Sequence, residues 1–292
     1  MEKERDLLEK VLTEAEAGYA GAYRFLLEKY EENPGAYGPQ TLYFLACLAG
    51  GAGLSEEALQ WLEEAVCHHG WWYRPEVLED DDLAALKDNA AFVSLKALSD
   101  KRYQAALSTA EAVFSRKEKS GDSLLIAVHG NTQNGEMARE DWAPFIQAHP
   151  RWQLETVQSG EPDGYGTYRW SYDRASCMPV AEAVMAVQKE PYECLAGGGF
   201  SAGCDMLLRA VAFTPARCGL LILQSPWIPV LQSDAEEVIR ALREKNIKLD
   251  IRCGSEDEDC LPMAQQLHAA AQAAGIPSEL TVQPGSRHQF PV

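Results

Sequence analysis

A serine flanked by glycines is the part of this sequence that most directly predicts chemistry. Gly199, Ser201 and Gly203 fit the pattern G-x-S-x-G, in which a tight turn between a strand and a helix lifts a serine hydroxyl clear of a sheet. The apolar stretch at 191–195 precedes the pattern, and apolar residues at helical spacing over 205–213 follow it,. The setting therefore predicts Ser201 as a nucleophile for acyl transfer.

The same glycines allow a second interpretation. Gly197, Gly199 and Gly203 also fit a G-x-G-x-x-x-G dinucleotide-binding turn. That turn needs an acidic residue at the end of the next strand to bind a ribose hydroxyl. The strand at 219–223 is followed by Gln224 instead, so the serine turn is the favoured interpretation.

A serine hydroxyl is a weak nucleophile without a histidine base and a carboxylate that orients the base. In turns of this kind the three residues follow one another in the chain order serine, acid, histidine. An acidic loop comes directly after a predicted strand at 248–252, and His288 comes shortly after a predicted strand at 279–282. Because parallel strands end at the same edge of a sheet, we expect both side chains near Ser201.

Four acids compete for the middle position of this set. Asp257 is favoured because Gly254 turns the chain out of the strand, so that the third residue beyond it projects back over the sheet edge. Glu256 is the second choice, and Glu258 is a third candidate. Asp259 has another role open to it, as the cap of a helix running through residue 262.

Acyl transfer also needs two backbone N–H groups that bind the developing oxyanion. One comes from the residue after the nucleophile, here Ala202, and the other from the loop after the first strand of the domain. That strand is predicted at 123–128, and Asn131 is the choice for the second donor. His129 is then expected to orient the loop rather than to act as the base.

The predicted elements place these residues in the second of two domains. Helical periodicity without strand signals extends from Glu2 to about Arg116, and a polar, apolar-poor stretch follows at 115–122,. Strands and helices alternate beyond it, which predicts a largely parallel sheet flanked by helices. We therefore expect an all-helical domain at 1–118 and an α/β domain at 119–292. The predicted strands are 123–128, 152–157, the strand before Ser201, 220–223, 248–252 and 279–282, and the predicted helices are 139–147, 176–188, the helix after Ser201, 235–244 and 262–274.

The first domain resembles degenerate tetratricopeptide repeats over about residues 40–106. The sequence predicts a hairpin of two helices, 39–48 and 56–68, with Ser55 as the cap of the second,. Such a domain implies a protein or peptide partner, and the aromatic run at 71–73 is a candidate contact patch. The alternative, which we favour, is that these aromatic side chains pack between helices.

The second domain resembles the α/β-hydrolase superfamily, and within it the phospholipase/carboxylesterase-like predicted esterases. The resemblance rests on His129-Gly130, Gly199 to Gly203, Gly254 to Asp257, and His288. It implies a serine hydrolase acting on a small or medium carboxylic ester through Ser201, Asp257 and His288, with a thioesterase or acyl-peptide hydrolase as alternatives. By the same resemblance, Tyr168, Trp170 and Tyr172 line the acyl site, although Trp170 and Tyr172 are equally consistent with the core.

Two parts of the usual fold are missing from this pattern. The first two strands of the superfamily have no counterpart, because the helical half takes their place in the sequence. The closing helix after the histidine is also absent, since only four residues follow His288. An alternative to an enzyme is therefore a scaffold protein, in which the hydrolase fold is catalytically inactive and the helical domain forms the scaffold.

Composition excludes some classes of partner. The formal net charge of −18 opposes nucleic acid and anionic membrane surfaces as partners,. No apolar leader or long apolar run is present, which predicts a cytoplasmic protein. The eight cysteines form no C-x-x-C pair and the histidines show no ligand spacing, so we expect reduced thiols, no metal and no cofactor,.

Overall fold

The computed structural model describes residues 4–290 and divides into two compact units. The first contains the described residues up to Ala110 together with Pro162–Tyr165, and the second contains Glu111–Glu161 and the described residues from Gly166 onward. The expected α/β architecture preceded by a helical domain is confirmed.

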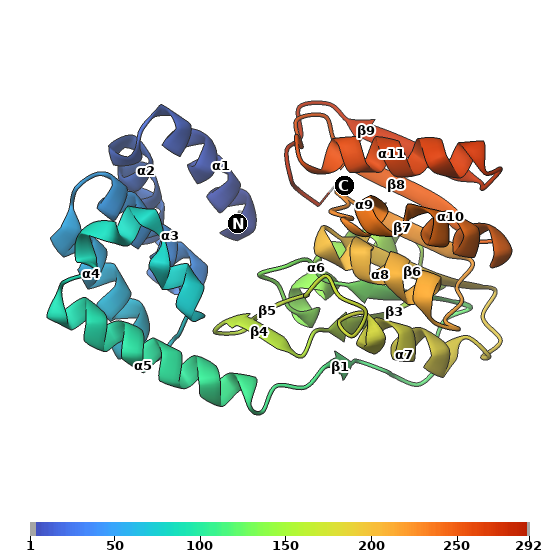
Figure 1. Cartoon of the computed structure of the whole chain (residues 1–292), viewed down its shortest axis with the longest axis horizontal. Helices are drawn as coiled ribbons and strands as arrows, with labels where there is room; N and C mark the ends of the chain where they lie inside the picture. Colours follow the sequence, from blue (N-terminus) through green and yellow to red (C-terminus); the bar gives the residue numbers. More distant parts are fainter. Residues whose placement is uncertain (1–3, 291–292) are drawn as a thin grey trace. The chain divides into compact units, whose positions relative to one another are not determined.

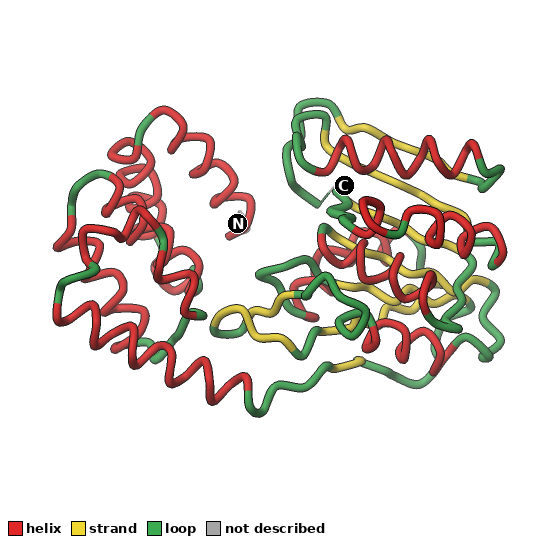
Figure 2. The backbone as a smooth tube through the Cα atoms, in the orientation of Figure 1, coloured by secondary structure: helices red, strands yellow, loops and turns green. Residues whose placement is uncertain are grey.

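The first unit is helical, apart from the short segment that it takes from later in the chain (Figures 1 and 2). Consecutive helices pack on one another around a single apolar core, which includes Leu26, Leu45 and Leu62. A distant carboxylate helps to start the third helix, because Glu4 accepts hydrogen bonds from the N–H of Gly38 and the hydroxyl of Thr41,. The elements are α1 (Glu4–Ala17), α2 (Tyr19–Glu32), η1 (Pro34–Ala36), α3 (Pro39–Gly51), α4 (Ser55–Glu63), η2 (Glu64–His68), η3 (Pro75–Glu79), η4 (Asp81–Leu86) and α5 (Ala90–Leu107).

The aromatic run at 71–73 packs largely inside this unit. Trp72 and Tyr73 are 9% and 4% exposed, and the Trp71 ring stacks on His69 with centroids 4.3 Å apart. The segment Pro162–Tyr165 joins the same unit through backbone hydrogen bonds, including one from the N–H of Tyr165 to the carbonyl of Trp72. Trp72 and Tyr73 therefore pack between helices, as the favoured alternative predicted.

Two local expectations for the helical half are wrong. Ser55 does not cap α4, because it is the first residue of the helix and the preceding Leu54 occupies the cap position without a side-chain hydrogen bond. The helical pattern does not reach Arg116 either, since α5 ends at Leu107 and Val113–Phe114 form strand β1. A strand of two residues is too short to give a period-2 signal, so only its pairing with a longer strand reveals it.

The second unit is built on a seven-stranded sheet with the order β1-β3-β2-β6-β7-β8-β9. Only β1 is antiparallel, and it pairs with β3 at the sheet edge. The strands are β2 (Ser123–Val128), β3 (Trp152–Gln158), β6 (Cys194–Phe200), β7 (Leu220–Gln224), β8 (Lys248–Gly254) and β9 (Ser278–Gln283), and β4 (Glu161–Gly164) and β5 (Thr167–Arg169) form a separate hairpin.

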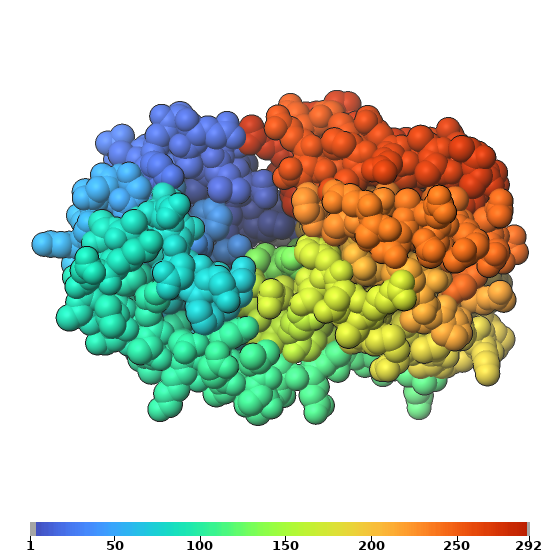
Figure 3. All heavy atoms as spheres, viewed as in Figure 1, coloured from blue at the N-terminus to red at the C-terminus, as the bar shows by residue number. Residues whose placement is uncertain are grey.

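The helices cover the two faces of this sheet unequally. One face packs on α7 (Met178–Val187), α8 (Ala202–Phe213), α10 (Ala235–Glu244) and α11 (Cys260–Ala273) in the largest apolar core, and the short α9 (Val230–Ser233) adjoins it. Figure 1 shows α7, α8 and α10 in front of the strands, and in Figure 3 the side chains of α8, α10 and α11 form a closed orange-to-red layer. The opposite face packs on α6 (Gly135–Ala148) through Trp142.

A polar pair lies in strand β8 at positions that do not join the large core. Asp250 and Arg252 alternate along the strand with the buried Ile251, and their side chains form an ion pair at 2.8 Å,. Phe290 from the C-terminal segment packs edge-on against Trp142 on the face covered by α6, with ring centroids 5.1 Å apart. The face of β8 outside the large core thus carries a polar pair, and Phe290 packs on the face covered by α6. Within residues 4–290, no helix combines the length and apolar character needed to cross a bilayer.

The close approach of α8 to β2 allows a mutational test. A Cβ atom at Gly203 would lie 2.4 Å from the carbonyl oxygen of Val128 and 2.6 Å from that of His129. We expect Gly203→Ala to destabilise the second unit by about 2 kcal/mol or more, because the backbone atoms that it meets cannot rotate away. Urea unfolding followed by far-ultraviolet circular dichroism measures this change.

Gly219→Ala is the matched control, because a Cβ atom there would meet only the carbonyl oxygen of Leu195 at 3.8 Å, an ordinary contact. An unfolding midpoint for Gly203→Ala equal to that of Gly219→Ala would contradict the close approach.

Candidate active site

Ser201 lies at the junction of β6 and α8 with a strained backbone. Its φ and ψ angles are 51° and −123°, and residues other than glycine rarely adopt this backbone conformation. Its N–H donates to the carbonyl of Gln224 at 3.0 Å, which ties the turn to the end of β7. Gly199 and Gly203 make the turn possible, because a Cβ atom on either would overlap neighbouring backbone. The serine hydroxyl is thereby presented at the carboxyl edge of the sheet.

His288 bridges Ser201 and Asp257. Its Nε2 lies 3.0 Å from the hydroxyl oxygen of Ser201, and its Nδ1 lies 2.8 Å from a carboxylate oxygen of Asp257. Because a carboxylate only accepts hydrogen bonds, Nδ1 carries the proton and Nε2 is free to accept the serine hydroxyl proton. Asp257 is 2% exposed. The arrangement has the geometry of a nucleophile, a base and an orienting acid.

The segment that carries His288 is held at several points although it has no helix. Gly254 lets it approach β8 closely, since a Cβ atom there would lie 2.1 Å from the carbonyl oxygen of Ser286. The Ser225 hydroxyl donates to the carbonyl of Gln289 at 2.8 Å. The Phe200 ring lies beneath both His288 and Phe290, at centroid distances of 5.3 and 5.7 Å. These contacts hold the chain before and after His288 and so fix the position of its imidazole.

Asp257 also starts helix α11. Its second carboxylate oxygen accepts the N–H of Cys260 at 3.1 Å. Burial by itself raises the pKa of Asp257, but the hydrogen bonds from His288 and Cys260 outweigh burial and hold it below its ordinary value,. The expectation that Asp259 caps this helix is wrong, because its side chain makes no cap hydrogen bond.

Two thiols lie beside the bridge from Ser201 to Asp257. Sγ of Cys260 is 3.4 Å from Nδ1 of His288, and Sγ of Cys253 is 3.7 Å from Asp257. Burial raises the pKa of both thiols, in the case of Cys253 to about 12. Both therefore stay protonated and neutral at physiological pH, and a neutral thiol is a poor nucleophile. The chemistry available to this site is that of the serine hydroxyl.

The loop after β2 is held by side-chain hydrogen bonds and approaches the serine turn at Gly130. A Cβ atom at Gly130 would lie 3.1 Å from Cβ of Ser201, which shows how closely this loop approaches the turn. The Gly130 N–H donates to the side chain of Gln133 at 2.8 Å. The Asn131 side chain accepts from the N–H of Trp170 at 2.9 Å and donates to the hydroxyl of Tyr172 at 3.1 Å.

His129 is a buried, neutral part of this loop. Its Nδ1 lies 2.6 Å from the carbonyl oxygen of Gly130, and its Nε2 accepts the N–H of Ser159 at 3.0 Å. One ring nitrogen is thus used within the loop and the other by the segment after β3, and burial lowers the pKa of His129 to about 4,. Its position matches the expected orienting role.

The three aromatic residues expected near the acyl group take different places. Tyr172 lines a cavity beside Ser201. Trp170 is 2% exposed, and its indole N–H donates to the carbonyl of His129 at 2.8 Å. The ring of Tyr168 faces that of His129, with centroids 6.5 Å apart. Trp170 and Tyr168 therefore support the loop after β2 and are not among the residues that line this cavity.

The cavity has a volume of about 220 Å³ and contains both members of the serine–histidine pair. Its lining residues are Tyr172, Ser201, Trp227, Asp259, Cys260 and His288. Sequence reasoning missed Trp227 and assigned no cavity role to Asp259 or Cys260. A usable signal was present, because Trp227 follows β7 at the same sheet edge as the serine turn,.

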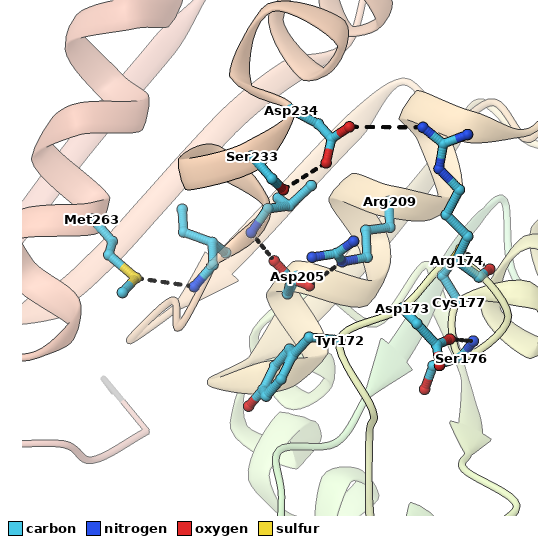
Figure 4. Close-up of polar contacts among 12 residues, drawn as sticks. Tyr172, Asp173, Arg174, Ser176, Cys177, Asp205, Arg209, Ser233, Asp234 and Met263 are labelled. Carbon is cyan, nitrogen blue, oxygen red and sulfur yellow. Dashed lines mark hydrogen bonds and ion pairs between the residues drawn. The ribbon is translucent and has the colours of Figure 1, made fainter.

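The loop that carries Trp227 is anchored by three neighbours. The N–H of Trp227 donates to the carbonyl of Ser201 at 3.3 Å, and the next N–H, of Ile228, lies 3.2 Å from the sulfur of Met263. Asp205, fully buried and paired with Arg209, accepts the N–H of Val230 at 2.8 Å (Figure 4). These contacts hold the loop that contributes Trp227 to the cavity wall.

Two groups of side chains bring three potential metal ligands within 4.8 Å of one another. They are Asp257 with Cys260 and His288, and Cys47 with Asp80 and Asp82. In the first group the acid and the imidazole are hydrogen-bonded to each other, and in the second Asp80 accepts from Tyr43 and from the N–H of Asp82. These polar atoms already have partners, so the geometry by itself assigns no metal.

Comparison with known proteins identifies the helical part of the chain. Residues 3–107 match the family described as A/B hydrolase-like, N-terminal domain. An uncharacterised protein of Bacillus cereus is 28% identical, with 99% of this chain and 94% of that chain covered and a TM-score of 0.53. The helical and α/β parts therefore occur together in another protein. No protein of curated function matches the sequence.

Two solved structures described as an esterase and an acyl-protein thioesterase match a smaller share of the chain. Esterase PE8 is 15% identical, over 62% of this chain and 90% of that chain, with a TM-score of 0.49. Acyl-protein thioesterase 2 of Zea mays is 18% identical, over 62% and 93% of the two chains, with a TM-score of 0.45. The sheet order and the match to the A/B hydrolase-like N-terminal domain together support the α/β-hydrolase fold.

The buried His129 predicts a specific loss of stability in acid. The unfolded chain binds a proton at this residue near pH 6.5, but the folded protein does so only near pH 4. The unfolded state therefore holds more protons between these values, and stability falls as the pH falls. We expect His129 to account for about 2 kcal/mol of lost stability between pH 7 and pH 5.

Urea unfolding at the two pH values measures this loss, and the dependence on pH should be shallower in His129→Gln by that amount. His149→Gln is the control, because His149 is exposed and should leave the dependence unchanged. Equal dependence in wild type and His129→Gln would show that His129 is not buried in its neutral form.

Proposed function

We propose, from the premise that this chain is an α/β-hydrolase whose residues 3–107 form an A/B hydrolase-like N-terminal domain, that it is a serine hydrolase of carboxylic esters. The observation that carries the proposal is the continuous hydrogen-bonded path from Ser201 through His288 to Asp257, with distances of 3.0 and 2.8 Å.

In the first half of the reaction the hydroxyl oxygen of Ser201 attacks the ester carbonyl. Nε2 of His288 accepts the hydroxyl proton, and Asp257 holds the imidazole through Nδ1 and stabilises the imidazolium that forms. The same Nε2 then returns the proton to the leaving alcohol as the carbon–oxygen bond breaks. The product is an acyl-enzyme on Ser201, with the alcohol released.

The oxyanion that forms on the carbonyl oxygen is bound by the N–H groups of Ala202 and Asn131 in this proposal. Ala202 is the first residue of α8, so its N–H is not needed within the helix,. The contacts of Gly130 and Gln133 support a fixed loop at Asn131. A donor that is positioned before the reaction costs no reorganisation when charge develops.

In the second half Nε2 of His288 takes a proton from water as the water oxygen attacks the acyl carbon. Nε2 then gives this proton to the oxygen of Ser201 as the bond between that oxygen and the acyl carbon breaks, which releases the carboxylic acid and restores the serine hydroxyl. No metal or cofactor takes part in these reaction steps. The cavity of about 220 Å³ is smaller than the roughly 300–1,000 Å³ typical of sites for drug-sized ligands,. It supports a small or medium ester as substrate, and a thioester would follow the same steps.

The strained backbone of Ser201 argues against the alternative of an idle fold. Residues other than glycine in this region of φ and ψ each cost about 1–3 kcal/mol of folding stability, and they cluster at functional sites. An idle scaffold would gain stability by losing that strain. The strain therefore favours an enzyme over a scaffold that binds partners only.

The role of Ser201 gives a direct test. We expect Ser201→Ala to lower kcat for p-nitrophenyl esters by roughly five to six orders of magnitude, because no other nucleophile replaces the hydroxyl. Reaction with a fluorophosphonate probe should disappear in the same variant.

Ser233→Ala is the control for this labelling, since Ser233 lies exposed in α9 and its hydroxyl donates to the neighbouring Asp234. Near-normal esterase activity in Ser201→Ala would overturn the proposal. Absence of both labelling and hydrolysis in the folded wild type would favour the idle scaffold.

The acid gives an independent test of the same mechanism. We expect Asp257→Asn to lower kcat about 10⁴-fold, because a neutral amide no longer fixes the imidazole with its proton on Nδ1. Glu256→Gln is the control, as Glu256 is exposed and pairs only loosely with Arg287 at 3.9 Å. A larger loss in Glu256→Gln than in Asp257→Asn would transfer the orienting role to Glu256.

A further inference from the structure

The cavity beside Ser201 has an acidic residue in its wall that the proposed reaction does not use. Asp259 lines the cavity together with Ser201 and His288 and is exposed to solvent. It makes no cap hydrogen bond to α11, since Asp257 accepts the first N–H of that helix instead. Within residues 4–290, its carboxylate forms no ion pair and no side-chain hydrogen bond that would neutralise it.

Two of the other residues that line this cavity are aromatic. Trp227 and Tyr172 both line it, and both are held by contacts on their own loops. The Trp227 backbone is tied to Ser201, and the Tyr172 hydroxyl accepts from Asn131 at 3.1 Å. Aromatic faces attract cations through their quadrupole, most strongly for tryptophan. A tryptophan, a tyrosine and a carboxylate around one small space form a surface that suits a positively charged group.

We propose that this cavity binds a cationic group of the substrate, an alkylammonium or quaternary ammonium, close to the scissile ester bond. The inference rests on the proposed ester hydrolysis and adds the substrate class. Asp259 supplies the charge, and Trp227 and Tyr172 supply the aromatic surface. Substrates with a carboxylate or phosphate at the same place are disfavoured, because Asp259 repels them.

Two features of the chain agree with this assignment. The formal net charge of −18 attracts cations to the whole molecule,. Close to Asp259 in sequence, Glu256 and Glu258 are also acidic, and Arg287 lies 3.9 Å from Glu256. The cation is bound beside the base because Asp259 and His288 line the same cavity.

The test compares two esters of butanoic acid that differ only in charge. Choline and 3,3-dimethylbutanol have the same shape, but only the first carries a positive charge. We expect the wild type to have a higher kcat/KM for the choline ester by about ten-fold, from one partly exposed ion pair and one or two aromatic contacts. Asp259→Asn should lower this ratio by about three- to five-fold.

The ratio separates recognition of charge from any general effect on catalysis, because both esters share the same acyl group and the same nucleophile. Glu258→Gln is the matched control. It removes the same unit of charge from the neighbouring exposed residue, which does not line the cavity. We expect the ratio in this variant to equal that of the wild type. An equal fall in both variants would assign the preference to overall charge and overturn the proposal.

A binding measurement keeps this inference distinct from the proposed reaction. Isothermal titration of choline into the full-length protein should show binding that Asp259→Asn weakens about three- to five-fold and Glu258→Gln does not, with 3,3-dimethylbutanol as the neutral comparison. If neither ester is cleaved, the hydrolase proposal fails, and the titration still decides the cation site. Equal binding of choline and 3,3-dimethylbutanol, or equal binding of choline by wild type and Asp259→Asn, would overturn the proposed cation site.

Discussion

The close contact between the first turn of α8 and the end of β2 is the constraint on which the site depends. Gly203 lies against the carbonyl groups of Val128 and His129, where no larger residue fits. That contact brings the strand–turn–helix at Ser201 beside the loop that carries Asn131. It also holds the serine in a backbone conformation that would relax in an isolated peptide,. The surrounding structure therefore stabilises a turn that is locally unfavourable.

His288 is held by contacts from distant parts of the chain. The imidazole is fixed by the approach of the chain at Gly254, by the hydrogen bond from Ser225 to Gln289, and by the ring of Phe200. Phe290 extends this anchor to Trp142 on the face covered by α6. A small number of specific contacts thus holds the imidazole beside Ser201.

The surroundings of the triad residues control charge as well as geometry. Buried thiols stay neutral, His129 stays neutral, and Asp257 keeps its charge because His288 and the first N–H of α11 both donate to it. The same helix start leaves Asp259 without a capping role and facing the cavity. A single acidic loop thereby supplies one carboxylate that orients the imidazole and, in our proposal, another that recognises a substrate.

Much of the fold followed from local pattern. The alternation of strands and helices from residue 123 onward predicted the parallel sheet, and the strand 123–128 has the predicted bounds. The order of Ser201, Asp257 and His288 indicated one shared edge because parallel strands all end there, and the three side chains lie in hydrogen-bond contact. Local pattern failed where partners are distant, as at Ser55, Asp259 and the two-residue strand β1.

By itself, the sequence determined the periodicity of the elements and which reactive residues follow which strands, because both depend on neighbours in the chain. Only the tertiary structure decided that Trp227 and Asp259 share a cavity with Ser201 and that Trp170 is a buried support. It also decided that Pro162–Tyr165 belongs with the helices. Side-chain environments of this kind depend on contacts between residues far apart in sequence, and those contacts form only when the chain has folded.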